Sequence, residues 1–192
     1  MRGSLASVFA LSVACAAAPV GAESKPGEGA SSRPAAASSK AAASSAVAAA
    51  RSSTTTIPLA PEGVAAAMRA PGAKLTIVNV WATWCEPCVR EMPGILRVAA
   101  RRAREGVGLV LISADFSSRR EAVVTQLDAW GYRGPRYLKD GDDDAFVNAI
   151  SRDWGGALPV TLVVDADGKA RFFHEGLLEE QTLDEVLALM VE

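Results

Sequence analysis

The stretch Val80-Trp81-Ala82-Thr83-Trp84-Cys85-Glu86-Pro87-Cys88 joins two segments of different pattern. Before it, residues 75–81 are almost continuously apolar, which is typical of a strand that is buried on both faces. After it, apolar residues recur at helical spacing from Glu86 to about Arg104. The two cysteines therefore stand where a buried strand ends and a helix begins.

Two cysteines in the first turn of a helix predict thiol–disulfide exchange. A thiolate at this position meets unpaired N–H groups and the positive end of the helix dipole, which lower its pKa from about 8.5. We expect Cys85 to lie at the exposed lip and to attack a disulfide. Cys88, one turn further in, is expected to be shielded and to resolve the mixed disulfide. Pro87 stiffens this turn at little cost, because its missing N–H would have been unpaired there.

Other roles for the cysteine pair are weaker. Half of a zinc site needs two further ligands, and neither Cys15 nor the single histidine, His174, can supply both. A purely structural disulfide would close a very small loop and would add little stability. The acidic stretch at residues 140–144 lacks the glycine and the glutamate that an EF-hand loop requires, so it is interpreted as the start of a helix. We expect neither a metal nor a cofactor.

The pattern on both sides of the motif alternates between strands and helices. Arginines gather at the end of the first helix, where they are expected to face the negative end of its dipole. Further strands are predicted at residues 107–114, 160–164 and 169–174, the last two as a hairpin, and further helices at residues 119–130, at residues 142–154 and after a capping Thr182. This order predicts an α/β fold with an antiparallel hairpin at one edge of the sheet.

The residues from Thr76 to Pro93, and more loosely Ile57–Glu192, resemble the TlpA/ResA-like branch of the thioredoxin superfamily. The quoted motif and the following Glu91-Met92-Pro93 carry this resemblance. It implies a thioredoxin-like fold, in which helices flank a central mixed β-sheet. It also implies an insertion between the active-site unit and the cis-proline hairpin, in agreement with the long separation between the cysteines and residue 159.

The resemblance also assigns residues that contact a substrate. Ala157-Leu158-Pro159-Val160-Thr161 matches the cis-proline loop, which places Pro159 beside the two cysteines. An extended substrate segment is expected to pair with the backbone of Leu158. Around the cysteines, Trp84 is expected to contact partners from the lip of the site, together with Glu86 and Pro87, whereas Trp81 is expected to pack in the core.

A carboxylate below the cysteines is the remaining site residue. Ordinary thioredoxins carry a buried aspartate six residues before the first cysteine, and here that position is Asn79, which cannot accept a proton. Glu91 lies one helical turn after Cys88, and the branch has a glutamate there. A carboxylate that is partly buried would have a raised pKa and could accept the proton of Cys88. The alternative is a Glu91 that is solvated or ion-paired.

These features predict a periplasmic thiol–disulfide oxidoreductase that reduces protein disulfides. The negative charges of Glu86 and Glu91 disfavour the thiolate, so we expect a reducing couple, nearer to about −270 mV than to about −120 mV. The expected partners are protein thiol or disulfide clients, by analogy apocytochrome c or a copper-site protein, and a membrane thiol that donates electrons. We expect a monomer and, with a net charge of −2, no nucleic-acid partner.

Two alternatives on the same fold are a copper-delivery module and a thiol peroxidase. The C-x-x-C spacing and the single His174 argue against copper delivery. The resolving thiol that Cys88 supplies three residues after Cys85 argues against a peroxidase. Copper binding and peroxide turnover would separate these alternatives from disulfide reduction.

The amino-terminal part of the chain predicts export. Residues 1–22 combine an early arginine, an apolar run and a small-residue cleavage site, as a signal peptide does. Cys15 stands in a loose lipoprotein box, so lipidation at Cys15, cleavage after Ala22 and an uncleaved anchor all remain open. Residues 23–56 are rich in Ala, Ser, Pro and Gly and are expected to form a disordered linker, which would tether a thioredoxin-like domain at residues 57–192.

Overall fold

The computed structural model of the chain describes residues 55–191. The expected signal peptide, with Cys15, lies outside the described residues, and so does nearly all of the expected linker. The described elements, in chain order, are β1 (Ile57–Leu59), α2 (Pro61–Ala67), β2 (Leu75–Trp81), α3 (Glu86–Arg102), β3 (Val107–Ser113), α4 (Arg120–Ala129), β4 (Arg136–Lys139), α5 (Asp143–Ile150), β5 (Val160–Asp165), β6 (Ala170–Glu175) and α6 (Glu180–Ala188), with short 3₁₀ turns at Ala103–Glu105 and Ser117–Arg119.

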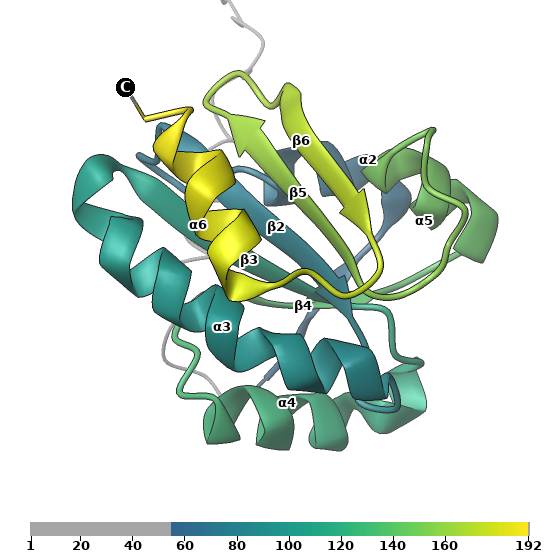
Figure 1. The fold of residues 1–192 in the computed structure, drawn as a ribbon. Helices are drawn as coiled ribbons and strands as arrows, with labels where there is room; N and C mark the ends of the chain where they lie inside the picture. Colours follow the sequence, from purple (N-terminus) through teal and green to yellow (C-terminus); the bar gives the residue numbers. More distant parts are fainter. Residues whose placement is uncertain (1–54, 192) are drawn as a thin grey trace, which may run out of the picture. The chain divides into compact units, whose positions relative to one another are not determined.

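The strands form one mixed sheet in the order β1-β4-β3-β2-β5-β6 (Figure 1). The four strands from β1 to β2 are mutually parallel, whereas β5 is antiparallel to both β2 and β6. Every residue of β2 is buried, which explains its nearly continuous apolar sequence. The connection from β3 to β5 carries α4, β4 and α5, and it is the insertion that the resemblance predicted.

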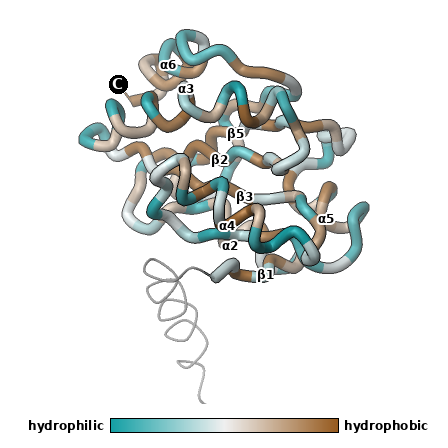
Figure 2. The backbone as a smooth tube through the Cα atoms, turned by 90° about the horizontal axis from the view of Figure 1, so that it is seen from below, coloured by the Kyte–Doolittle hydropathy of each residue, from teal (hydrophilic) through white to brown (hydrophobic). Residues whose placement is uncertain are grey.

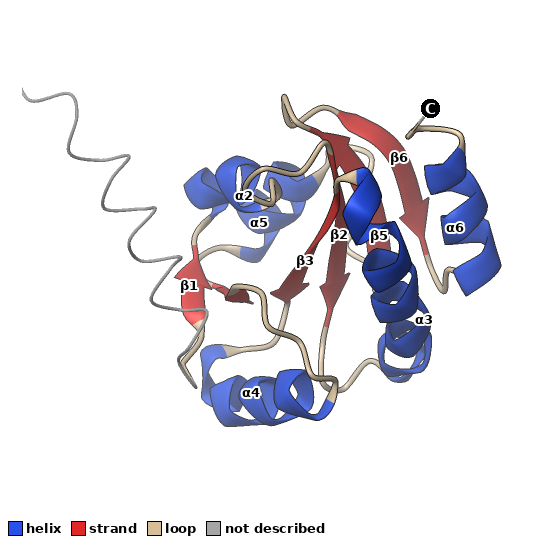
Figure 3. Cartoon of the chain, turned by 90° about the vertical axis from the view of Figure 1, so that its left-hand side faces the viewer, coloured by secondary structure: helices blue, strands red, loops and turns tan. Residues whose placement is uncertain are grey.

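Helices cover both faces of the sheet (Figure 3). Ile77 and Trp81 of β2 pack in the same core as buried residues of α3, α4 and α6. Val78 and Val80, which point the other way, pack with α2 and α5. The helices are accordingly amphipathic, and the tube of α3 and α6 alternates between brown and teal (Figure 2). Among residues 55–191, no helix is both long enough and apolar enough to span a bilayer.

The structure confirms the predicted strand β2, helix α3 and terminal hairpin, and it corrects other expectations. Thr182 does not cap the last helix, because Glu179 holds the N-cap position and the helix begins at Glu180. Helix α5 ends at Ile150 rather than near Trp154, and Asp142 caps it by accepting a hydrogen bond from Ala145 N at 2.8 Å. The elements β1, α2 and β4 were not predicted.

Candidate active site

The two cysteines lie at the amino end of α3, directly after the strand at the centre of the sheet. Cys85 is the N-cap residue of α3 and is disulfide-bonded to Cys88, with their Cα atoms 5.3 Å apart. The backbone N–H of Cys88 points at Cys85 Sγ, 3.3 Å away. A thiolate on Cys85 would therefore receive a hydrogen bond and would face the positive end of the helix dipole.

Cys85 is more enclosed than the sequence predicted. It is only 5% exposed, because it packs in the core shared by β2 and α3, whereas Cys88 is fully buried. Cys85 is nevertheless the more exposed of the two cysteines, as expected. The exposed lip is formed instead by Trp84, at 58% exposure, and by the exposed Glu86, with Pro87 half-buried. Trp81 is buried in the core, as predicted.

A buried aspartate holds the loop that leads to Cys85. Asp115 Oδ2 accepts a hydrogen bond from Thr83 N at 2.8 Å, and Asp115 Oδ1 accepts one from Thr83 Oγ1 at 2.6 Å. Ser113 Oγ, at the end of β3, donates to the same carboxylate at 2.9 Å. Asp115 was not predicted from the sequence. Its signal was a charged residue just after a buried strand, at the sheet edge where the parallel neighbour β2 also ends.

Glu91 lies between α3 and the sheet and is 5% exposed. Its Oε1 accepts a hydrogen bond from Asn79 Nδ2, and its Oε2 accepts one from Leu178 N, both at 2.8 Å. Burial raises the pKa of Glu91, although these two bonds and the nearby His174 act in the opposite direction. The predicted burial is confirmed, and the alternative of a solvated Glu91 is wrong. Its role as the base for Cys88 stays a prediction.

A row of polar side chains crosses the sheet beneath Glu91. Asn79 is opposite Thr161 on β5, and Thr161 is opposite His174 on β6. Asn79 Nδ2 donates to Thr161 Oγ1 at 3.0 Å, while Asn79 Oδ1 is buried without a partner. His174 Nε2 lies 3.2 Å from the carbonyl oxygen of Leu177, which can only accept, so Nε2 carries a proton. Sequence analysis missed this row because strand register brings it together.

The cis-proline loop lies beside the end of β2. The Leu158–Pro159 bond is cis, as the resemblance predicted. Val160 is paired with Val80, so Pro159 is level with the last residue of β2 and close to the loop that carries the cysteines. Leu158 is partly buried and packs against the core cluster that contains both cysteines.

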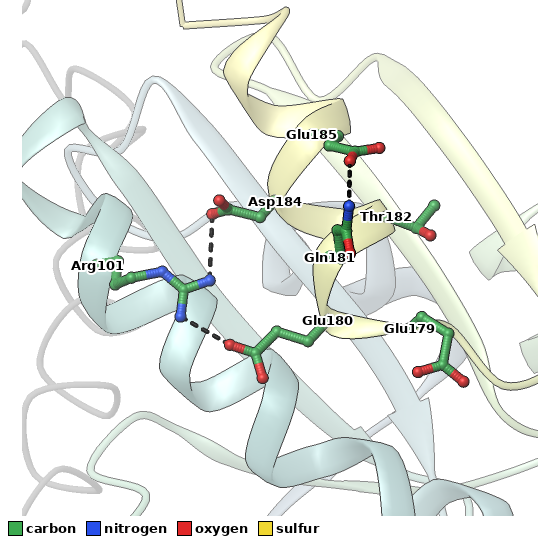
Figure 4. Close-up of a pocket in the computed structure, with 7 residues that line it drawn as sticks. All are labelled: Arg101, Glu179, Glu180, Gln181, Thr182, Asp184 and Glu185. Atoms are coloured by element: carbon green, nitrogen blue, oxygen red, sulfur yellow. Dashed lines mark hydrogen bonds and ion pairs between the residues drawn. The ribbon is translucent and has the colours of Figure 1, made fainter.

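Arg101 and Arg102 lie in the last turn of α3, as predicted, and the arginines near this end also form ion pairs that were not predicted. Arg97 and Arg101 form ion pairs with Glu180, and Arg101 and Arg102 form ion pairs with Asp184 of α6, as Figure 4 shows for Arg101. These arginines hold the pKa values of the two carboxyl groups below their ordinary range. The pairs join α3 to the start of α6, two residues after Leu178, whose N–H binds Glu91. Within residues 55–191, no group of three or more His, Cys, Asp or Glu side chains is placed to hold a metal ion.

The sequence is similar to those of known thiol–disulfide oxidoreductases. The sequence profile described as Redoxin matches residues 38–187. The chain is 27% identical over 130 residues to the thiol-disulfide oxidoreductase ResA of Halalkalibacterium halodurans, a match that covers 67% of this chain and 69% of the relative. It is 30% identical over 120 residues to the thiol:disulfide interchange protein DsbE of Allochromatium vinosum, covering 62% of this chain but only 60% of that protein.

Solved structures agree with the fold. A secreted thiol-disulfide isomerase from Corynebacterium glutamicum aligns with a TM-score of 0.53 at 18% identity, over 62% of this chain and 71% of that one. A thiol:disulfide interchange protein of the thioredoxin family from Chlorobium tepidum aligns with a TM-score of 0.51 at 23% identity, over 63% of this chain and 82% of that one. The matches confirm both the fold and the resemblance predicted from the cysteine motif.

Proposed function

The chain belongs to the Redoxin family, and from this premise we propose that it is a periplasmic thiol–disulfide oxidoreductase that reduces protein disulfides. The observation that carries the proposal is the Cys85–Cys88 disulfide at the amino end of α3, with the buried carboxylate of Glu91 one turn further along the same helix. The names of the ResA and DsbE relatives support the reaction class. The protein clients and the direction of exchange are part of the proposal.

The first half-reaction takes place at Cys85. In the reduced protein, the Cys85 thiolate attacks one sulfur of a client disulfide, so that a Cys85–client disulfide forms and the other client sulfur leaves as a thiolate. The N–H of Cys88, which points at Cys85 Sγ in the oxidised form, stabilises the attacking thiolate. The neighbouring Trp84, Glu86 and Pro87 contact the client, and the backbone of Leu158 pairs with its extended segment.

The second half-reaction takes place at Cys88. Its thiol transfers a proton to Glu91 and attacks Cys85 Sγ. The client leaves with its second sulfur reduced, and the Cys85–Cys88 disulfide is restored to the form in the structure. A carboxylate can act as this base because burial raises its pKa towards that of the thiol. Two electrons from a membrane thiol donor then reduce the disulfide for the next cycle.

The charges around the cysteines favour the reducing direction. Glu86 occupies the first helical position after Cys85, Glu91 is buried one turn below Cys88, and Asp115 is buried under the loop before Cys85. Negative charges near a thiol disfavour the thiolate. They offset part of the stabilisation that the helix N-terminus gives to the Cys85 thiolate, and a couple with a less stabilised thiolate is more reducing, nearer to about −270 mV than to about −120 mV.

The cellular setting follows from the pattern of residues 1–22, which supports export across the inner membrane. We propose that the domain is periplasmic and is joined by the linker at residues 23–56 to an amino end that is lipidated at Cys15 or cleaved after Ala22. Its clients are proteins that need reduced cysteines in an oxidising compartment, with cytochrome c maturation or a similar process as the setting.

A redox titration of the full chain tests the proposal. The protein is equilibrated with dithiothreitol buffers of known potential, and the fraction of Cys85–Cys88 disulfide is measured by alkylation and mass spectrometry. A midpoint near that of thioredoxin, together with turnover of a peptide disulfide that Cys85→Ser abolishes and Cys15→Ser does not, supports a reductase. A midpoint near −120 mV contradicts the direction. Peroxide turnover without disulfide turnover would support the thiol peroxidase instead.

A further inference from the structure

Two aromatic side chains are exposed on two loops that are bonded to each other, one of which leads directly to Cys85. Among residues 55–191 the exposed large apolar side chains are Trp84 at 58%, Phe116 at 65% and Leu189 at 81%. Trp84 directly follows Thr83, and Phe116 directly follows Asp115. Because Thr83 N and Asp115 Oδ2 are hydrogen-bonded at 2.8 Å, the loops that carry the two rings are fixed against each other.

Cationic side chains lie on the same loops as these rings or close to them. Arg119 Nη1 donates to Thr83 Oγ1 at 3.3 Å, which brings its guanidinium to the same loop. Lys139 Nζ lies 5.7 Å from the centroid of the Phe116 ring and is also paired with Asp143. Within residues 55–191, neither Arg119 nor Arg120 has an acidic side chain within ion-pair distance. The surface beside Phe116 thus has cations without carboxylate partners.

We propose that Trp84, Phe116 and Arg119 form a client-binding surface, which takes an extended, cysteine-containing segment of a client protein that carries apolar and acidic side chains beside its cysteine. The surface deepens the disulfide exchange proposed above and depends on it. Any client must bring a disulfide sulfur to Cys85, and the Thr83–Asp115 hydrogen bonds join the loop that carries Phe116 to the loop that leads through Trp84 to that cysteine.

The side chains of the client-binding surface favour a client segment with apolar and acidic residues. An aromatic ring that is exposed in the free protein gains free energy when an apolar side chain covers it. The unpaired guanidinium of Arg119 favours an acidic side chain on the client and repels a basic one. Phe116 therefore acts as a specificity-determining residue that lies in the loop after β3, outside the cysteine motif.

Single-turnover exchange with the reduced full chain measures this preference. Two synthetic peptides of equal length each carry one cysteine as a mixed disulfide with thionitrobenzoate. The apolar–acidic peptide has Leu and Asp beside its cysteine, and the polar peptide has Ser and Asn. Cys85 attacks the peptide sulfur and expels coloured thionitrobenzoate, after which Cys88 displaces the peptide thiol and the Cys85–Cys88 disulfide forms. Bis(2-hydroxyethyl) disulfide serves as the small neutral substrate.

Phe116→Ser should lower the rate constant for the apolar–acidic peptide about five- to tenfold, the loss expected when a contacting aromatic side chain is truncated. The polar peptide and bis(2-hydroxyethyl) disulfide should react at the wild-type rate. Arg119→Gln should lower the rate constant only for the apolar–acidic peptide. This reduction should be smaller at high salt, which screens the charge of Arg119 in the wild-type protein. Leu189→Ser, which removes an equally exposed apolar side chain from the end of α6, should change none of these rates.

Three results would overturn the client-binding surface. One is a wild-type rate of Phe116→Ser on the apolar–acidic peptide. Another is an equal loss on all three substrates, which would make Phe116 a support of the loop. A third is a dimer of the wild-type protein that Phe116→Ser dissociates, because the surface would then bind a second copy. If the wild-type protein reacts with no disulfide at all, the proposed function itself fails, and this outcome is distinct from the other three.

Discussion

Glu91 Oε1 and Asn79 Nδ2 lie 2.8 Å apart in the buried layer between α3 and the sheet. The amide that replaces the aspartate of ordinary thioredoxins is therefore a hydrogen-bond donor to the carboxylate that has moved to the helix. A second carboxylate at position 79 would have repelled the charge of Glu91, whereas the amide supports it. The hydrogen bond from Asn79 thus orients the carboxyl group of Glu91, which lies one helical turn after Cys88.

Glu91→Gln should slow the resolution of the mixed disulfide. Glutamine keeps the shape of the side chain but cannot accept the proton of Cys88, and base catalysis of this kind contributes about 10²–10⁴-fold. The loss should be largest near neutral pH and should shrink at alkaline pH, where Cys88 loses its proton unaided. Stopped-flow release of a peptide thiol from pH 7 upward measures this, with Glu62→Gln on α2 as the control. Equal rates for Glu91→Gln and wild type at every pH would leave Glu91 without a catalytic role.

The same variant should change the pH dependence of stability. Burial raises the pKa of Glu91 above its ordinary 4.5, so the folded state favours the uncharged acid. Its stabilisation is fully present below the ordinary pKa and is lost as the pH rises through the raised value. Oxidised Glu91→Gln should therefore gain stability relative to the wild type as the pH rises from 4 to 8, as measured by urea denaturation. A difference that stays constant over this range would show that the pKa of Glu91 is not raised.

The two cysteines should differ when each is replaced. Cys85→Ser should abolish disulfide reduction, because it removes the attacking sulfur. Cys88→Ser should accumulate client mixed disulfides through Cys85, because the resolving thiol is missing. Both are made with Cys15→Ser, so that mass spectrometry of adducts reports only this site. If adducts formed on Cys88 in the Cys85→Ser protein faster than on Cys85 in the Cys88→Ser protein, the assignment of the two roles would be wrong.

Asp115→Ala should destabilise the fold and slow exchange with every disulfide. It leaves the buried groups Thr83 N and Ser113 Oγ without their acceptor, a loss of about 1–3 kcal/mol in the free energy of unfolding. Asp115→Asn, which retains one acceptor, should recover part of both losses. Urea denaturation and the rate with bis(2-hydroxyethyl) disulfide measure the two effects. Asp167→Ala, in the exposed hairpin turn, is the control and should change neither.

The sequence predicted the elements whose burial is continuous or strictly periodic. β2 and α3 were predicted closely because one is covered on both faces and the other has a clear apolar stripe. β4 was not predicted, because Arg136 and Lys139 are its two ends and leave only two apolar residues between them. Arg136 is nevertheless buried and pairs with Asp128 on α4, a contact that only the folded chain provides.

The residues near the cysteines in the chain were predicted from the motif, and the cis-proline loop from the resemblance, but the polar contacts across the sheet were not. The motif and its flanking helix indicated Cys85, Cys88 and Glu91, which are close in sequence. Asp115 reaches Thr83, and Thr161 reaches Asn79, only because neighbouring strands are in register, which a single sequence does not reveal. His174 joins them in the same way from an edge strand. A polar residue within or just after a buried strand was the one available signal for Asn79 and Asp115.

The pairing of β1 determines where the described part of the chain enters the sheet relative to Cys85. β1 is parallel to β4, β3 and β2, so the chain enters the sheet heading towards the end at which β2 delivers Cys85. It does so along the edge of the sheet, three strand spacings or about 14 Å to the side of β2. In the sheet, Ile57 pairs with Tyr137, Tyr137 with Ile112 and Ile112 with Val80, so β1 begins level with the carboxyl end of β2. The two ends that matter for attachment and chemistry therefore share one end of the sheet, and a domain held at Ile57 would present its cysteines beside the point of attachment.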